Sequence, residues 1–394
     1  MSDTEPESTV RRLASLRDRL EAGMDRREFV RTLVTGGYAL GMAHFLGVED
    51  FLSADDGEVP VVTALVREDP ADPYSLTERT RDVPADWYAA VETATNLNEK
   101  LAKRAFTGYL GSAVVPGSYD SGTASVSIGI SSDADSIPDA ISEFAEDISI
   151  NPQTLIEIES IEEGPDLSTA RPRFASQIPA DGPPSGVACE TPSSLATLSP
   201  ALYDPVDERA FFATAEHAFD IDGAPIGERV TLPVQGGDLF TLGAVEQAFP
   251  VEDVVAVSPA DGDGLQPSSW IDAPESVRVN GQLTKFGLAD LVARDEELEK
   301  VGALTGHTTG RVQGIDAVTC FTDDFCRRGQ IRWGGEMDLT DGDSGSVSYY
   351  PDPEGDDDTV LVAGFNNART WWPGQSYVWG VSAYHLTETQ GYHF

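Results

Sequence analysis

A serine enclosed by two glycines and an aspartate lies in the run Thr340 to Val347, TDGDSGSV. This run suits a nucleophilic hydroxyl, because the serine must project from a tight turn and small neighbours let backbone amides converge on a developing oxyanion. We therefore expect Ser344 to be a nucleophile and the amides of Gly342 and Ser344 to form an oxyanion hole. The alternative is an ordinary Asp-Gly turn between two strands.

A general base is predicted at His217, where the apolar run Phe211 to Phe219, FFATAEHAF, leads directly into a histidine. A base needs a rigid support and a pKa near neutrality, and the end of a buried strand offers both. The other reading is a core histidine bonded to the backbone.

A carboxylate that orients the imidazole is predicted at Asp253, at the start of the apolar run DVVAV. Its neighbour Glu252 would point to the opposite face of a strand. The order along the chain is histidine, aspartate, serine, which is the order of one known type of catalytic triad.

These stretches resemble the trypsin-like, or chymotrypsin-fold, serine proteases, particularly the bacterial alpha-lytic protease and streptogrisin branch. The run Thr214 to His217, the DVVAV run and the GDSG loop are similar to three motifs of that family, and Gly306 to Gly310 (GHTTG) resembles its Gly-Arg-Thr-Thr-Gly segment. The resemblance covers about residue 178 to residue 394. It implies two perpendicular antiparallel β-barrels with the triad in the cleft between them.

The resemblance also implies three further roles. Asp338, six residues before Ser344, would lie at the base of the primary specificity pocket and favour basic residues in substrates, unless it is a solvated turn residue. His307 would take the place of an arginine that holds the aspartate before the nucleophile, here Asp343, so we expect a His307–Asp343 ion pair. The substrate backbone would lie along the strand that contains Val378, Trp379 and Gly380.

Two substitutions depart from the family pattern. Ser346 replaces the commoner second glycine after the nucleophile, and Glu216 replaces a small residue before the histidine. Neither change removes a catalytic group. The disulfide usual at the nucleophile loop cannot form, because that loop contains no cysteine.

The 394 residues include 67 acidic and 26 basic side chains, a formal net charge of −41. This charge repels phosphate backbones and anionic membranes, so nucleic acid is excluded as a partner. The acid is spread along the chain and only four lysines occur, which resembles a protein from a halophile. Three cysteines are too few for a metal cluster, and Cys320 and Cys326 are candidates for closing a small loop.

The length and the pattern predict a mainly β protein with an α+β unit before it. Residues 1–54 contain Arg26 and Arg27 before a weakly apolar run and resemble a twin-arginine export signal, although a soluble amphipathic helix is the other reading. Residues 55–175 are expected to form the α+β unit and linker. In position and size this unit resembles the pro-regions of the bacterial proteases, and the alternative is a permanent accessory domain. Within it we expect a helix over 87–106, a strand over 123–130, a helix over 137–148 and a strand over 155–161. Residues 176–394 form the protease-like domain, with one helical stretch over 288–301.

We therefore expect an exported serine endopeptidase, extracellular or on the cell surface, that hydrolyses polypeptides without metal or cofactor. We expect a monomer that contacts a membrane only through an uncleaved export segment. Two alternatives remain: a binding module that keeps the fold without turnover, and an esterase in which His385 would be the base.

Overall fold

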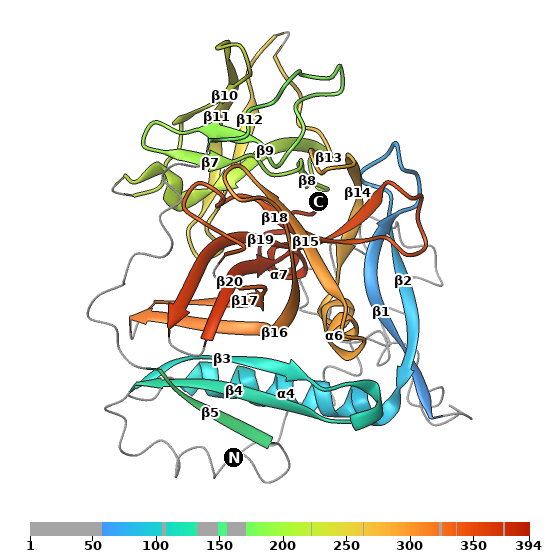
Figure 1. Ribbon diagram of the computed structural model, residues 1–394. Coiled ribbons are helices and arrows are strands. Elements are labelled where there is room, and N and C mark those ends of the chain that lie inside the picture. The colour runs from blue at the N-terminus through green and yellow to red at the C-terminus, as the bar shows by residue number, and fades with distance from the viewer. Residues whose placement is uncertain are drawn as a thin grey trace, which may run out of the picture.

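The computed structural model describes residues 57–104, 108–131, 149–155 and 171–394, the last range without 222, 263, 323, 324, 336, 373 and 374. In this part the protein is mainly β, and most of its strands form two curled sheets (Figure 1). Of the predicted fold class, two antiparallel β-barrels after a small α+β unit, the mainly β content and the two curled sheets are confirmed. The predicted export segment lies outside the described residues, and among the described helices none is long and apolar enough to cross a membrane.

The first sheet has seven strands in the described chain, in the order β7-β6-β10-β11-β12-β9-β8. The strands are β6 (Ala188–Glu190), β7 (Leu195–Thr197), β8 (Leu202–Asp204), β9 (Arg209–Ala215), β10 (Arg229–Pro233), β11 (Leu239–Phe249) and β12 (Val254–Pro259). Alternation along β9 and β12 buries Phe212 and Val257 inside this sheet, and each packs into the core cluster with Leu242. The two strands pair antiparallel with Ala215 opposite Val254, which brings their ends together.

The second sheet contains the strands of the C-terminal half. They are β13 (Trp270–Ile271), β14 (Val277–Leu283), β15 (Glu297–Gly302), β16 (Gly306–Thr322), β17 (Phe325–Trp333), β18 (Val347–Pro351), β19 (Thr359–Trp372) and β20 (Gln375–Ser382). Two helices accompany them, α6 (Lys285–Ala293) and the C-terminal α7 (Ala383–Gln390). The loop that carries Ser344 connects β17 to β18.

The N-terminal elements join this second sheet. They are β1 (Glu58–Arg67), β2 (Leu76–Pro84), α4 (Ala85–Arg104), β3 (Tyr109–Pro116), β4 (Ala124–Ser131) and β5 (Ser149–Leu155). Strand β1 pairs with β14 and β3 pairs with β16, so the sheet reaches 13 strands in the described residues. One apolar cluster includes Val59 and Trp87 from the N-terminal part and Leu361 from β19.

Two of the expected N-terminal elements are confirmed with shifted bounds: α4 for the helix over 87–106, and β4 for the strand over 123–130. The expected helix over 137–148 lies outside the described residues, as does all but the first residue of the expected strand over 155–161.

The prediction of one helix over 288–301 is wrong. The helix is α6, whose first turn is capped by Thr284, and it ends before Arg294. Residues Glu297–Gly302 instead form β15, which pairs with both β16 and β18. Because this pairing joins segments distant in sequence, a local helical pattern could not predict it.

Candidate active site

The loop around Ser344 has the backbone that a nucleophile turn requires. Gly342 and Gly345 have φ angles of 98° and 96°, which residues with a Cβ rarely adopt. A Cβ on Gly345 would also lie 2.3 Å from the carbonyl oxygen of Thr197. Both glycines are therefore needed to hold Ser344 at this bend.

Among the residues that the structure describes, no acceptor competes for the amides predicted to form the oxyanion hole. The carbonyls of Gly342 and Ser344 accept hydrogen bonds from Oγ1 and N of Thr197, at 2.8 and 2.9 Å. Within the described chain, neither the amide of Gly342 nor that of Ser344 donates a hydrogen bond. Both amides are thus available to a negatively charged oxygen.

His217 and Asp253 meet where β9 and β12 come together. His217 follows β9 in a 3₁₀ turn, and Asp253 directly precedes β12 with a φ of 61°. Nδ1 of His217 lies 2.7 Å from Oδ2 of Asp253, and the His217 amide donates to Oδ1 at 2.9 Å. Two contacts to one carboxylate fix the imidazole and favour a proton on Nδ1, which leaves Nε2 as the acceptor.

His217 and Asp253 differ sharply in their exposure to solvent. The His217 side chain is 45% exposed, whereas that of Asp253 is fully buried. Burial lowers the pKa of His217, but the hydrogen bond and charge of Asp253 more than offset it, so the pKa is raised above its ordinary value. Glu252 takes no part in this pair: it is buried, and its Oε1 accepts from Nε2 of Gln390 at 3.1 Å.

The Ser344 loop lies against the end of the strand that leads to His217. A Cβ on Gly345 would lie 2.6 Å from Oγ1 of Thr214 and 3.2 Å from the amide of Ala215, two residues before His217. No hydrogen bond joins Ser344 Oγ to His217 among the described residues. This is common without substrate, because such contacts tighten only in the reacting complex.

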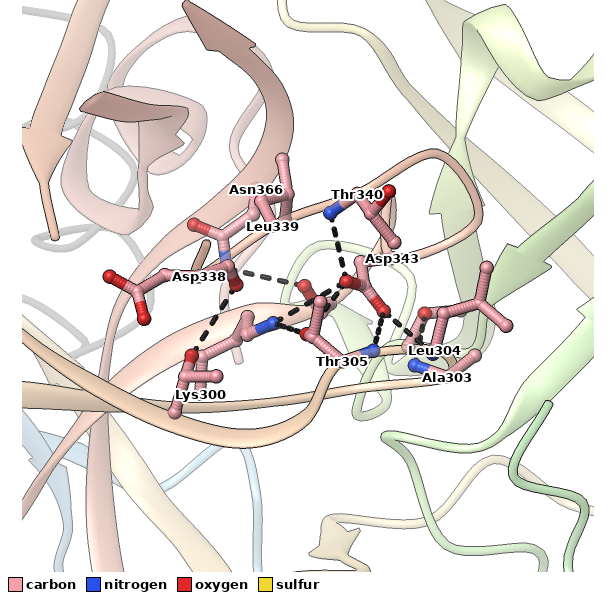
Figure 2. A network of polar contacts seen from close by, with 12 residues as sticks. Lys300, Ala303, Leu304, Thr305, Asp338, Leu339, Thr340, Asp343 and Asn366 are labelled. Carbon is pink, nitrogen blue, oxygen red and sulfur yellow. Dashed lines mark hydrogen bonds and ion pairs between the residues drawn. The ribbon is translucent and has the colours of Figure 1, made fainter. Parts of the chain in front are cut away.

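The predicted His307–Asp343 pair is wrong, and Lys300 is the cation beside Asp343. Nζ of Lys300 lies 3.6 Å from Oδ2 of Asp343 and donates to Oγ1 of Thr305 (Figure 2). Nε2 of His307 instead lies 2.7 Å from Oε2 of Glu299. The strand register explains the difference. Val301 is opposite His307 in the β15–β16 ladder, and residues opposite each other lie on the same face of the sheet. Glu299, two residues before Val301, lies on this face too, whereas Lys300 points to the other, buried face.

Asp343 itself is held from several sides. Its carboxylate accepts from the amides of Leu304, Thr305 and Thr340 at 2.7, 3.1 and 3.0 Å, and from Oγ1 of Thr305 at 2.7 Å (Figure 2). Both Asp343 and Lys300 have 0% exposed side chains, and burial lowers the pKa of Lys300 while Asp343 opposes that shift. The network anchors the loop one residue before Ser344.

The prediction that the substrate backbone lies along the strand of Val378, Trp379 and Gly380 is also wrong. Val378, Trp379 and Gly380 lie in β20, which pairs with β17 on one side and β19 on the other. A strand with both edges occupied cannot pair with a substrate backbone. The free edge belongs to β19: its pairing with β18 ends at Phe365, and beyond this residue the described chain supplies only β20 as a partner.

Asp338 lies at the end of a short turn. Its Oδ2 accepts from the amide of Gly335 at 2.7 Å, and burial raises the pKa of the carboxyl group. Its role in substrate selection stays a prediction.

Four residues of this region were missed by the sequence reasoning: Lys300, Arg327, Asn366 and Asn367. The rarity of lysine, of which the chain has only four, is the signal that could have drawn attention to Lys300. Asn366 accepts from the amide of Gly345 at 2.9 Å, and Nδ2 of Asn367 donates to the carbonyl of Glu252 at 3.2 Å. Among the described residues no group of His, Cys, Asp and Glu is arranged to hold a metal ion.

Comparison with solved structures finds many matching chains, and three of them are proteases of low sequence identity to this chain. The Thermobifida fusca protease A has a TM-score of 0.38 at 15% identity, over 53% of this chain and 96% of its own. A Cellulomonas bogoriensis chymotrypsin has a TM-score of 0.36 at 14% identity, over 54% and 97%. The MamO protease domain from Magnetospirillum magneticum has a TM-score of 0.30 at 14% identity, over 50% and 88%. No family model and no curated protein matches the sequence.

Proposed function

We propose that the protein is a serine endopeptidase of the trypsin-like type. Ser344 Oγ attacks the peptide carbonyl, Nε2 of His217 takes the proton and later delivers it to the leaving amine, and water then hydrolyses the acyl-enzyme. Asp253 orients the imidazole and stabilises its charged form. The amides of Gly342 and Ser344 bind the oxyanion, and this chemistry requires no metal or cofactor.

The observation that carries the proposal is the His217–Asp253 pair. A fully buried carboxylate makes two contacts with one half-exposed histidine, directly beside a serine loop bracketed by two left-handed glycines. A purely structural histidine has no need of a neighbouring serine with two unoccupied amides.

The substrate backbone is proposed to bind along β19 after Asn366. The carbonyl of Asn366 already accepts from the amide of Gly345, so the free edge begins next to the nucleophile loop. An extended peptide can add to such an edge through main-chain hydrogen bonds. The proposal extends to a bacterial-type, exported and salt-adapted enzyme, on the strength of the paired arginines and the acidic composition.

A fluorophosphonate probe applied to the full chain tests this function, because only an activated serine reacts quickly with it. The wild type and the Ser346→Ala variant, which lacks a different serine of the same loop, should label. Ser344→Ala should not. A wild type that stays unlabelled, while it remains folded, would favour the binding module without turnover.

A further inference from the structure

Arg327 lies at the candidate triad although it belongs to the other sheet. Asp253 precedes β12 of the seven-stranded sheet, whereas Arg327 is in β17 of the second sheet. Nη1 of Arg327 donates to Oδ2 of Asp253 at 2.9 Å, and the same oxygen lies 2.7 Å from Nδ1 of His217. One carboxylate oxygen is thus shared by an imidazole and a guanidinium group.

The hairpin that carries Arg327 restrains it. Cys326, the preceding residue, forms a disulfide with Cys320 on β16, and Thr319 stands opposite Arg327 in the strand register. The Arg327 side chain is 14% exposed and that of Asp253 is fully buried. The contact therefore joins two groups with little freedom to separate.

A fixed positive charge at this point has two electrostatic effects. It offsets the cost of burying the Asp253 carboxylate, and it opposes protonation of the nearby imidazole. In the described part of the chain, the charged groups that face His217 are Asp253, Glu216 and Arg327. Burial and Arg327 lower the pKa of His217, while Asp253 and Glu216 raise it.

We infer that Arg327 is a positioning residue of the triad, which fixes the Asp253 carboxylate from the opposite sheet and limits the basicity of His217. The inference rests on the proposed function. Arginine stays protonated at ordinary pH and cannot serve as the base, so its effect passes through Asp253 and His217.

The test is the pKa of the His217 ring in the full chain, followed by NMR across a pH titration and assigned with a His217→Gln variant. Arg327→Gln should raise this pKa by about one unit, because a nearby positive charge is lost. Arg327→Lys, which keeps the charge, should restore most of the wild-type value. Arg328→Gln is the matched control. The Arg328 side chain faces away from Asp253 and donates to the carbonyl of Ala102 at 3.1 Å.

Arg327→Gln leaves Asp253 buried without its partner. If this variant does not fold for that reason, a second comparison measures the same pKa shift. Asp253→Asn and the double variant Asp253→Asn/Arg327→Gln contain no such carboxylate, and the double variant should have the higher His217 pKa. An unchanged pKa in both comparisons, or an equal shift in Arg328→Gln, would overturn the inference.

The rate of fluorophosphonate labelling separates this inference from the proposed function. In Arg327→Gln the acid limb of the labelling rate should move upward together with the NMR value. An unlabelled wild type in which the His217 pKa still responds to Arg327 would refute the protease and leave the charge coupling intact. If the wild type labels but the acid limb of the labelling rate is at the same pH in Arg327→Gln, the role of Arg327 in the triad is contradicted.

Discussion

At the scale of single residues, the contact between His217 and Asp253 decides how the candidate site works. The carboxylate is fully buried and accepts hydrogen bonds from both the ring Nδ1 and the backbone amide of the same histidine. An asparagine in its place would present an amide group toward Nδ1, which favours the wrong tautomer of the imidazole.

Substitution of the triad should therefore have graded effects. We expect Ser344→Ala and His217→Ala to lower kcat by about 10⁶-fold, and Asp253→Asn by about 10⁴-fold. Steady-state hydrolysis of a casein substrate measures this, with Glu252→Gln as the control for a neighbouring carboxylate. Loss of activity in Glu252→Gln with none in Asp253→Asn would show that the triad is misassigned.

The pH dependence of activity should follow the raised pKa of His217. The base must be neutral to accept a proton, so activity is lost as pH falls through the pKa of the free enzyme. Because Asp253 raises that pKa, we expect the acid limb of kcat/KM to lie above about 6.5, the ordinary histidine value. Profiles of kcat/KM measured between pH 4 and pH 10 check this, and a midpoint well below 6.5 would contradict it.

Lys300, and not His307, should matter for the stability of the nucleophile loop. Lys300→Met leaves the Asp343 carboxylate buried without its cation, which costs about 3–5 kcal/mol of unfolding free energy. His307→Gln breaks a partly exposed pair with Glu299 and should cost about 0–1 kcal/mol. Urea unfolding of the two variants compares these values, and similar losses in both would refute the assignment of Lys300.

At the scale of elements, the β16–β17 hairpin links the N-terminal part to the candidate triad. Its consecutive residues Arg327 and Arg328 reach opposite sides, one to Asp253 and the other to the carbonyl of Ala102 at the end of α4. The disulfide between Cys320 and Cys326 closes this hairpin. The element is thus suited to hold a side chain at a sheet-to-sheet contact.

Removal of that disulfide should weaken both the fold and the site. A loop of this length contributes about 2 kcal/mol through the unfolded chain, so Cys320→Ser/Cys326→Ser should lose that much stability. The His217 pKa should rise as Arg327 gains freedom. Urea unfolding and the NMR titration measure the two effects.

Cys189 provides the control for this prediction. Its thiol is buried, and burial raises its pKa to about 12, so it should react with neither oxidants nor disulfides. Reductant should destabilise the wild type and a Cys189→Ala variant by equal amounts. A larger effect on the wild type would contradict the structural role of the Cys320–Cys326 bridge.

At the scale of the whole molecule, the N-terminal elements are packed into the C-terminal half. Arg79 of β2 forms an ion pair with the fully buried Asp352, and Oγ1 of Thr284 donates to the carbonyl of Val62 at 2.6 Å. Nε2 of His393, next to the last residue, lies 2.9 Å from the carbonyl of Pro73. These contacts favour a permanent accessory unit over a removable pro-region.

Expression of residues 171–394 alone should therefore give an unstable or insoluble product. The truncation exposes the edges of β14 and β16 and opens the shared apolar core. Thermal unfolding and gel filtration compare it with the full chain, and co-expression of residues 57–155 should restore solubility. A stable and active fragment would identify the N-terminal unit as a pro-region.

The local motifs of the sequence determined the mainly β class, the glycine-bracketed Ser344 loop, and the strands that end at His217 and begin at Asp253. Each depends on neighbouring residues: turn glycines, alternating apolar positions and a titratable group at a strand end. Only the tertiary structure decided which cation reaches Asp343, which strand edge is free and which arginine contacts Asp253. Lys300, β19 and Arg327 are brought to the site by strand register and by pairing between segments far apart in sequence, and a one-residue change of register turns every side chain to the other face.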